Sequence, residues 1–431
     1  MRELLKTVIT DFHRRRLPES MIERELSLPN APGKIQCITG PRRAGKTTYL
    51  YSLIQTALRT GDRREKHVYI NFEDERLSFT TETLQEIINA YQQLYPDINL
   101  ANVCFYFDEI QQVSGWEKFV RRLLDTTTQH IYITGSSAKL LSREIATQLR
   151  GRTLASTLLP FSLRERLAYF NINPDDVYNT TNRNRIIAQF EEHLRRGGYP
   201  ETLEVDDDVF IRIMQEYGDV LLYRDVIERH NIHNPHLAKE LMLRLFANNA
   251  KPLSIHKLYN DFRSQGLRTS KDTLYTFVDH FRDAYAVFEV KRYDRSPSRR
   301  AHSKSKIYLN DVGYSTAYQP AFTEDLGQKL ETFVYLELIR KYGEVYYATG
   351  QFGECDFVVL RRGTVQLLIQ VCSQLTSQNR KREVKGVQEA IRVFGMSEGF
   401  LLTRDQEETI EVGAGVVYVV PAWKWLLIKD R

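Results

Sequence analysis

The sequence lacks any uninterrupted apolar run of the roughly 18 to 20 residues that a membrane-spanning helix needs. Its first twenty residues, MRELLKTVITDFHRRRLPES, contain no apolar core of the kind that marks a signal peptide. The four cysteines, Cys37, Cys104, Cys355 and Cys372, are far apart and show no metal-ligand spacing. We therefore expect a cytoplasmic protein with reduced cysteines and no membrane partner.

A strong excess of one charge is also absent. The net charge is only +5 over 431 residues, with 27% charged and 42% hydrophobic residues, as in an ordinary globular protein. This balance permits nucleic-acid binding without arguing for it, so the distribution of charge along the chain matters more. The length exceeds one hydrophobic core and predicts two or three domains.

A phosphate-binding loop is predicted between an apolar strand and a helix. Residues 34–39 have the pattern of a buried strand, residues 40–47 match GxxxxGK(S/T), and residues 48–54 have a helical pattern. In such a loop backbone N–H groups surround a phosphate, Lys46 bridges the β- and γ-phosphates and Thr47 ligates Mg²⁺. The predicted nucleotide-binding residues are Gly40, Pro41, Arg42, Arg43, Ala44, Gly45, Lys46, Thr47 and Thr48.

Two further apolar runs supply an independent half of this site. Residues 103–109 end in Asp108 and Glu109, which we expect to orient magnesium-bound water and to act on the attacking water. Residues 130–134 run into Gly135, and either Thr134 or Ser136 would sense the γ-phosphate; Ser136 is taken as the catalytic candidate. With one more strand at 68–74, these runs predict an α/β three-layer domain over residues 30–165.

Arginine is the remaining group that such a site needs. Arg152 follows the third of these runs and could reach a γ-phosphate in its own chain or across a subunit boundary. A plain surface arginine is an equally good interpretation. A role across a boundary would imply a homo-oligomer.

The sequence resembles the AAA-type ATP-binding proteins whose P-loop domain is joined to a C-terminal domain of unknown function with a nuclease-like core. The matching segments are residues 38–40, 107–111, 115–116, 134–137, 151–152, 159–162, 197–200, 223–229 and 354–357. The resemblance implies ATP and Mg²⁺ as cofactors and a helical lid after the ATPase core. Arg229 would be a second sensor on that lid, and a helix-surface arginine is nearly as good an interpretation.

Residues 236–310 predict three helices and a β-hairpin, an arrangement typical of a winged helix with a long basic wing. Cations dominate the hairpin connection, in which Asp294 is the only acid; they are Lys291, Arg292, Arg295, Arg299, Arg300 and Lys304. Such a loop suits the DNA phosphate backbone rather than base reading. A solvated hairpin tip or a protein-docking fold remains the alternative.

The C-terminal part has an α/β pattern with part of a magnesium nuclease site. Glu331 on a helix and Asp356 at the start of a strand fit that site, whereas Gln370 and Cys372 stand where Glu-x-Lys would be. Without that carboxylate and lysine, we expect a nuclease-like domain that is inactive.

The predicted fold is therefore an α/β chain of four parts: a P-loop AAA-type ATPase core (1–165), a helical lid (166–235), a winged-helix domain (236–322) and a nuclease-like α/β domain (323–431). The leading hypothesis for function is ATP-driven conformational work on branched or duplex DNA. The alternatives are a nucleotide-controlled switch that acts on a protein partner and an ATP-gated nuclease.

Overall fold

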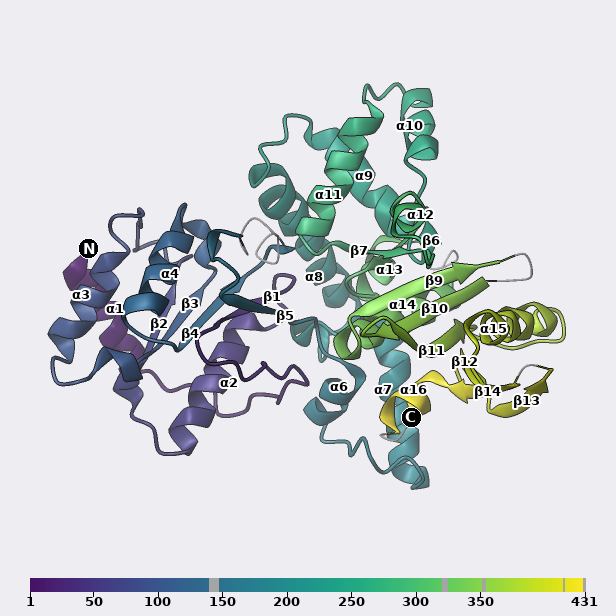
Figure 1. Cartoon of the computed structure of the whole chain (residues 1–431), viewed down its shortest axis with the longest axis horizontal. Coiled ribbons are helices and arrows are strands. Elements are labelled where there is room, and N and C mark those ends of the chain that lie inside the picture. The colour runs from purple at the N-terminus through teal and green to yellow at the C-terminus, as the bar shows by residue number, and fades with distance from the viewer. Residues whose placement is uncertain (139–146, 320–324, 351–353, 414, 429–431) are drawn as a thin grey trace. The chain divides into compact units, whose positions relative to one another are not determined.

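The computed structural model describes residues 1–431 apart from 139–146, 320–324, 351–353, 414 and 429–431. The chain divides into two compact units, Met1–Leu159 and Pro160–Arg431. Figure 1 shows the helices and strands of both units. Within the described part of the chain, no helix has the length and apolar character needed to cross a membrane.

The first unit is built on a five-stranded parallel sheet with the order β2-β3-β4-β1-β5. The strands are β1 (Ile35–Thr39), β2 (His67–Asn71), β3 (Cys104–Asp108), β4 (Ile131–Gly135) and β5 (Thr153–Thr157). The first four confirm the apolar strands expected from the sequence. β5 was not predicted, because this edge strand is only half-buried and has no continuous apolar run.

Helices cover both faces of this sheet, which confirms the three-layer architecture. They are α1 (Arg2–Arg14), α2 (Lys46–Arg59), α3 (Gln85–Leu94) and α4 (Trp116–Thr126). Cys37 of β1 belongs to the core with α1, α3 and α4, whereas its neighbour Ile38 belongs to the core with α2. Successive residues of a strand point to opposite faces, so each face has its own core.

The strand register places the carboxyl ends of β1, β3 and β4 at one edge of the sheet. Thr39 of β1 lies beside Gly135 of β4, and Phe107 of β3 lies beside Ile133. Asp108, which ends β3, is therefore next to Thr134. The loop of residues 40–47 leaves β1 at the same edge, which brings the predicted motifs together.

The second unit begins with helices that occupy the segment expected as a lid. They are α6 (Leu163–Tyr169), α7 (Thr180–Arg196), α8 (Asp207–Val220) and a π-helical continuation, η6 (Leu221–Glu228). α7 and α8 pack against α13 (Gly313–Tyr318), and α7 also packs against α14 (Leu326–Lys341). These helices are thus integral to the second unit.

Residues 235–309 contain three longer helices, one short helix and a three-stranded antiparallel sheet with the order β6-β8-β7. Its elements are α9 (Pro235–Ala247), β6 (Lys251–Pro252), α10 (Ile255–Ser264), α11 (Lys271–Asp283), β7 (Val287–Lys291), α12 (Pro297–Ala301) and β8 (Ser305–Leu309). The connection between β7 and β8 contains the short helix α12, whereas the sequence predicted only a loop there.

A six-stranded mixed sheet with the order β13-β14-β12-β11-β10-β9 completes the second unit. Its strands are β9 (Glu344–Thr349), β10 (Glu354–Arg361), β11 (Thr364–Val371), β12 (Glu398–Thr403), β13 (Glu408–Val412) and β14 (Gly415–Pro421). Phe357 of β10 stacks on Tyr335 of α14, while Val358 joins the core with α15 (Arg380–Phe394). The two helices therefore cover opposite faces, and α16 (Ala422–Leu427) follows β14.

Candidate functional site

The loop between β1 and α2 has the backbone of a phosphate cradle. Gly40 has φ 147°, and a Cβ atom there would lie 2.0 Å from the carbonyl oxygen of Leu158. Gly45 has φ 94° and caps α2, which starts at Lys46. Only glycine tolerates the close approach at the first position and the left-handed backbone at the second without strain. The first N–H groups of α2 thus remain available for an anion.

The ammonium group of Lys46 lies inside this loop. Its Nζ donates to the carbonyl oxygens of Gly40 and Pro41, each at 3.1 Å, and lies 3.3 Å from Oε1 of Glu109. A buried cation needs such acceptors to stay charged. Phosphate oxygens of a nucleotide would replace the loop carbonyls as its partners.

The carboxylate of Asp108 is held by three hydroxyl groups. Thr47 and Tyr69 donate to Oδ2 at 2.6 and 2.7 Å, and Thr134 donates to Oδ1. Burial raises the pKa of Asp108, although the hydrogen bonds from Thr134 and Thr47 act against this shift. A hydroxyl beside a carboxylate offers the hard oxygen ligands that Mg²⁺ prefers, so Thr47 and Asp108 fit the expected metal.

Glu109 leaves β3 with a left-handed backbone, φ 54°, which is uncommon for a residue with a side chain. Its Oε2 accepts from Nε2 of Gln111 at 2.5 Å and from N of Ser136 at 3.1 Å. Burial alone would raise its pKa, but Lys46, Gln111 and Arg42 outweigh burial and lower the pKa of Glu109 to about 2. The side chain is therefore a fixed carboxylate at neutral pH.

Both sensor candidates lie at this edge of the sheet. Thr134 is fully buried and its hydroxyl contacts Asp108 and the backbone N of Glu109. Ser136 contacts Glu109 through its backbone N, and its Oγ lies 3.5 Å from Nε2 of Gln111. Thr134 thus contacts Asp108, the predicted metal-side carboxylate, and Ser136 contacts Glu109, the carboxylate predicted to act on water. A sensor role for either residue stays a prediction.

The remaining loop residues are arranged around this centre. Arg42 pairs with Glu73 at 3.1 Å, Arg43 is exposed with φ 62°, and Thr48 is exposed in the first turn of α2. Pro41 and Ala44 are buried.

Arg152 lies at the amino end of the parallel strands, whereas the phosphate loop lies at their carboxyl end. It directly precedes β5, its carbonyl accepts from N of Ile35 at 2.7 Å, and its guanidinium pairs with Asp125 of α4. Because β5 and β1 run parallel, a strand length of roughly 17 Å separates Arg152 from the loop that follows β1. This separation counts against a role of Arg152 in its own chain and favours a role across a subunit boundary, which stays a prediction.

Three contributors were missed from the sequence. Arg24 donates to the carbonyl oxygens of Ala44 at 2.8 Å and Leu159 at 2.5 Å, which ties the N-terminal segment to the phosphate loop. Tyr69 and Gln111 hold Asp108 and Glu109. The position of Gln111 two residues after Glu109 was a usable signal, whereas Arg24 stands in a segment without periodic pattern.

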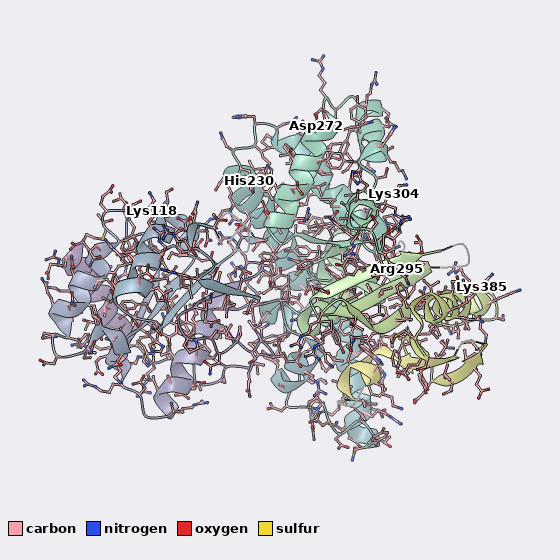
Figure 2. All side chains as sticks on the ribbon, in the orientation of Figure 1. Lys118, His230, Asp272, Arg295, Lys304 and Lys385 are labelled. Carbon is pink, nitrogen blue, oxygen red and sulfur yellow. The ribbon has the colours of Figure 1, made fainter. Side chains whose placement is uncertain are left out.

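The second unit contains the other predicted residues. Arg229 pairs with Asp225 at 2.6 Å near the end of η6, and its sensor role stays a prediction. In the connection between β7 and β8, Arg295, Arg299 and Lys304 are exposed; Figure 2 labels Arg295 and Lys304.

The other cations of that connection are half-buried, and two of them, Arg292 and Arg300, contact β9. Arg300 lies over the ring of Tyr346 at 5.0 Å and donates to its hydroxyl at 3.1 Å. The next residue of β9, Tyr347, accepts from N of Tyr293 at 2.7 Å, and Arg292 forms a β-bridge with it. Lys291 and Arg292 are likewise only partly exposed. The connection is thus docked on the C-terminal sheet along part of its length.

Two residues of the predicted nuclease-like site, Glu331 and Asp356, form ion pairs with the same lysine, Lys306. Nζ of Lys306, from β8, lies 2.8 Å from Asp356, 3.0 Å from Glu331 and 2.7 Å from Glu354. Lys306 is buried, and Tyr308 also donates to Glu331 at 2.6 Å. Burial and the neighbouring Asp356 raise the pKa of Glu331 to about 8. Burial would lower the pKa of Lys306, but the three acidic side chains raise it above its ordinary value.

Gln370 lies beside this group and is turned away from the lysine. Its Oε1 accepts from N of Asp356 at 3.2 Å, and its Nε2 donates to Glu383 at 2.8 Å. Both ends of the amide are therefore engaged by protein groups.

Comparison with known proteins places this geometry in a family. Residues 32–167 match a family model described as an AAA domain, and residues 187–325 match a domain of unknown function (DUF8612). An uncharacterized protein of Methanocaldococcus jannaschii is 34% identical over 98% of this chain and 95% of its own length. An uncharacterized protein of Haemophilus influenzae is 26% identical over 91% of this chain and 94% of its own length.

Solved structures give weaker matches. PCH-2 of C. elegans is 15% identical with a TM-score of 0.30, covering 48% of this chain and 60% of that one. The ORC1 protein of Aeropyrum pernix in complex with DNA is 12% identical with a TM-score of 0.28, covering 74% and 90%. The assignment therefore depends on the sequence relatives and the AAA model: the chain belongs to the family of the M. jannaschii protein, and its N-terminal unit is an AAA domain of the P-loop ATPase class.

Proposed function

We propose that the chain hydrolyses ATP with Mg²⁺ and uses the cycle for conformational work on DNA. The proposal of ATP hydrolysis depends on one observation. Thr47 donates a hydrogen bond to Asp108 and Lys46 forms an ion pair with Glu109, both at the carboxyl ends of the parallel strands. A cation, a hydroxyl–carboxylate pair and a second carboxylate are what phosphoryl transfer to water requires.

Each residue then has a distinct task. The loop N–H groups and Lys46 bind the phosphates, and Thr47 with Asp108 holds Mg²⁺, which supplies charge neutralisation for the phosphate oxygens. Glu109 is ionised and held by Gln111 and by N of Ser136, so it can orient the attacking water and accept its proton. The hydroxyl of Thr134 connects the carboxylate of Asp108 to the backbone N of Glu109 and would transmit the state of the γ-phosphate.

DNA is proposed as the partner on the strength of residues 235–309. The chain runs through α9, the short strand β6, α10, α11 and the hairpin of β7 and β8, which is the order of elements of a winged helix, with α11 in the position of a recognition helix. Tyr275 of α11 is 59% exposed, and the neighbouring connection presents Arg295, Arg299 and Lys304. Exposed cations on a hairpin suit phosphate contacts.

A salt titration tests this partner. The triple variant Arg295→Ala, Arg299→Ala, Lys304→Ala should bind duplex DNA more weakly and show a salt dependence reduced by up to about 3 phosphate contacts. A control variant, Lys118→Ala, Arg361→Ala, Lys381→Ala, removes three exposed cations from other elements and should bind like the unchanged protein. Equal binding by both variants would remove the proposed contact surface.

We further propose that the C-terminal domain is nuclease-like and inactive. Lys306 places its ammonium group among Glu331, Glu354 and Asp356, where a metal nuclease would hold Mg²⁺, and Gln370 is engaged elsewhere. Supercoiled plasmid should stay intact with Mg²⁺ or Mn²⁺. Nicking that disappears in Asp356→Ala would contradict this part and favour an ATP-gated nuclease.

One observation favours a second function, a nucleotide-controlled switch acting on a protein partner. Lys291, Arg292 and Arg300 are half-buried, and Arg300 is docked on β9, so only part of the predicted basic surface is presented. Under this alternative, ATP turnover would be indifferent to DNA. A homo-oligomer is compatible with both functions, because a finger role for Arg152 would have to be exerted on a second copy of the chain.

A further inference from the structure

A group of metal-ligating side chains lies in the second unit, apart from the residues discussed so far. His230, His280 and Asp283 each offer one ligand atom, and the three atoms lie within 4.8 Å of one another. All three residues are half-buried. The imidazole rings of His230 and His280 are stacked, with centroids 3.7 Å apart and planes inclined by 14°. Figure 2 labels His230.

Regular backbone holds each of these side chains in place. His280 and Asp283 are three residues apart on α11 and therefore project from the same face of the helix. His230 stands just after η6, where Asn231 has φ 50° and N of Ile232 donates to the carbonyl oxygen of Ile227 at 3.0 Å. This is a left-handed helix ending, which fixes the direction in which the chain leaves.

The two backbones are held relative to each other by a third helix. α9 packs against both η6 and α11, and Ile232 belongs to the same apolar core as Leu274 and Phe281 of α11. The imidazole of His230 therefore meets α11 through a packed frame rather than through a mobile loop.

We propose that His230, His280 and Asp283 bind a divalent transition-metal ion of the zinc class. Two imidazoles and one carboxylate suit Zn²⁺, which takes such ligands at about 2.0–2.2 Å in a tetrahedron, with ligand atoms about 3.3 Å apart. The three ligand atoms already lie within 4.8 Å of one another, and rotation of the side chains, including one of the two stacked rings, would bring them to that spacing. The half-buried position leaves the fourth place to water.

The bound ion joins the end of η6 to α11. His230 follows the continuous helical segment formed by α8 and η6, whereas His280 and Asp283 belong to the helix proposed to face DNA. A metal at this point therefore fixes the orientation of α11 within the second unit. The site does not depend on the ATPase proposal, because none of its residues belongs to the nucleotide site.

Metal uptake by the full chain tests this site. Protein stripped with a chelator is dialysed against Zn²⁺ without nucleotide, and bound zinc is measured together with the thermal unfolding midpoint. We expect one additional Zn²⁺ per chain relative to the double variant His230→Ala, His280→Ala, and a higher midpoint with Zn²⁺ than without. Co²⁺ in place of Zn²⁺ gives a direct optical signature of nitrogen and oxygen ligation.

Two further variants make the result decisive. Asp283→Asn keeps the size of the side chain and the ring stack, and should weaken Zn²⁺ binding by at least about tenfold. His256→Ala removes an exposed histidine from α10 and should leave the uptake unchanged. The proposal is overturned if the unchanged protein takes up no more Zn²⁺ than the double variant, or if Asp283→Asn binds it with unchanged affinity.

Discussion

Lys46 and Glu109 face each other at 3.3 Å in the interior of the candidate site, and both are nearly excluded from water. The ammonium of Lys46 lowers the pKa of the Glu109 carboxyl, and the carboxylate is an ionic partner for the ammonium. A nucleotide would enter a site in which the charges needed for catalysis are already fixed. This pair is therefore the place at which single substitutions are most informative.

Lys46→Ala should lower ATP turnover at least about 100-fold, because it removes the cation that faces the phosphates. Arg59→Ala, an exposed change at the other end of α2, is the matched control and should turn over ATP normally. Turnover is measured by phosphate release, with thermal unfolding to show that both variants fold. Normal turnover in Lys46→Ala would refute the assignment of the loop.

The depressed pKa of Glu109 predicts a specific pH dependence of stability. Its pKa is about 2 in the folded chain against an ordinary value of 4.5, so its stabilising contribution is complete above about pH 4.5 and is lost as pH falls toward about 2. The shift corresponds to roughly 3 kcal/mol at neutral pH. The free energy of unfolding of the unchanged protein should exceed that of Glu109→Gln most at neutral pH. The difference should shrink below about pH 4.5, and a difference that stays constant with pH would contradict the pairing.

At the scale of elements, the phosphate loop depends on a close approach that can be tested apart from backbone strain. Gly40 and Gly61 both have positive φ, 147° and 93°, but a Cβ would meet Leu158 only at Gly40. Gly40→Ala should cost about 1–3 kcal/mol of stability and weaken nucleotide binding, because the loop must move. Gly61→Ala should cost roughly 1 kcal/mol from strain and leave nucleotide affinity unchanged. Urea unfolding and nucleotide titration measure both; equal nucleotide affinities would argue against the cradle.

The elements also show how far the sequence could lead. Strands β1 to β4 were predictable because they are apolar on both faces and end in motif residues, and the parallel register then forced Thr47 and Asp108 together. β5 was missed because it is only half-buried and has no continuous apolar run, and without β5 the position of Arg152 in the sheet could not be deduced. The role of Lys306 could not be predicted from the sequence. Its ammonium group contacts Glu331 and Asp356, which are 25 and 50 positions away, and no periodic sequence pattern indicates such contacts.

For the whole molecule, the buried cluster around Lys306 is a polar connection between distant parts of the second unit. It joins β8 to α14 and β10, so it ties residues 235–309 to the C-terminal sheet. Removing one partner of a buried ion pair leaves the others uncompensated. The cluster thus holds the proposed winged helix against the C-terminal sheet.

Lys306→Met should destabilise the chain by roughly 3–5 kcal/mol, and the double variant Lys306→Met, Asp356→Asn should lose less than the sum of the single changes by about 1–3 kcal/mol. Lys304→Met, an exposed lysine two residues earlier, serves as the control and should have little effect. Chemical unfolding monitored by fluorescence gives the free energy of unfolding of the two single variants, the double variant and the control. Additive losses would mean that the lysine and the aspartate do not stabilise each other.

What the ATPase acts on is a property of the full chain, and steady-state ATP turnover by the full chain is the most direct test of the proposed work on DNA. It should be measured with and without Mg²⁺, and with single-stranded, duplex and branched DNA at low salt. Turnover should require Mg²⁺, disappear in Lys46→Ala, and rise several-fold with duplex or branched DNA but less in the variant lacking Arg295, Arg299 and Lys304. Turnover that is Mg²⁺-dependent but identical with every DNA would contradict the proposed work on DNA, and no turnover under any condition would contradict the ATPase itself.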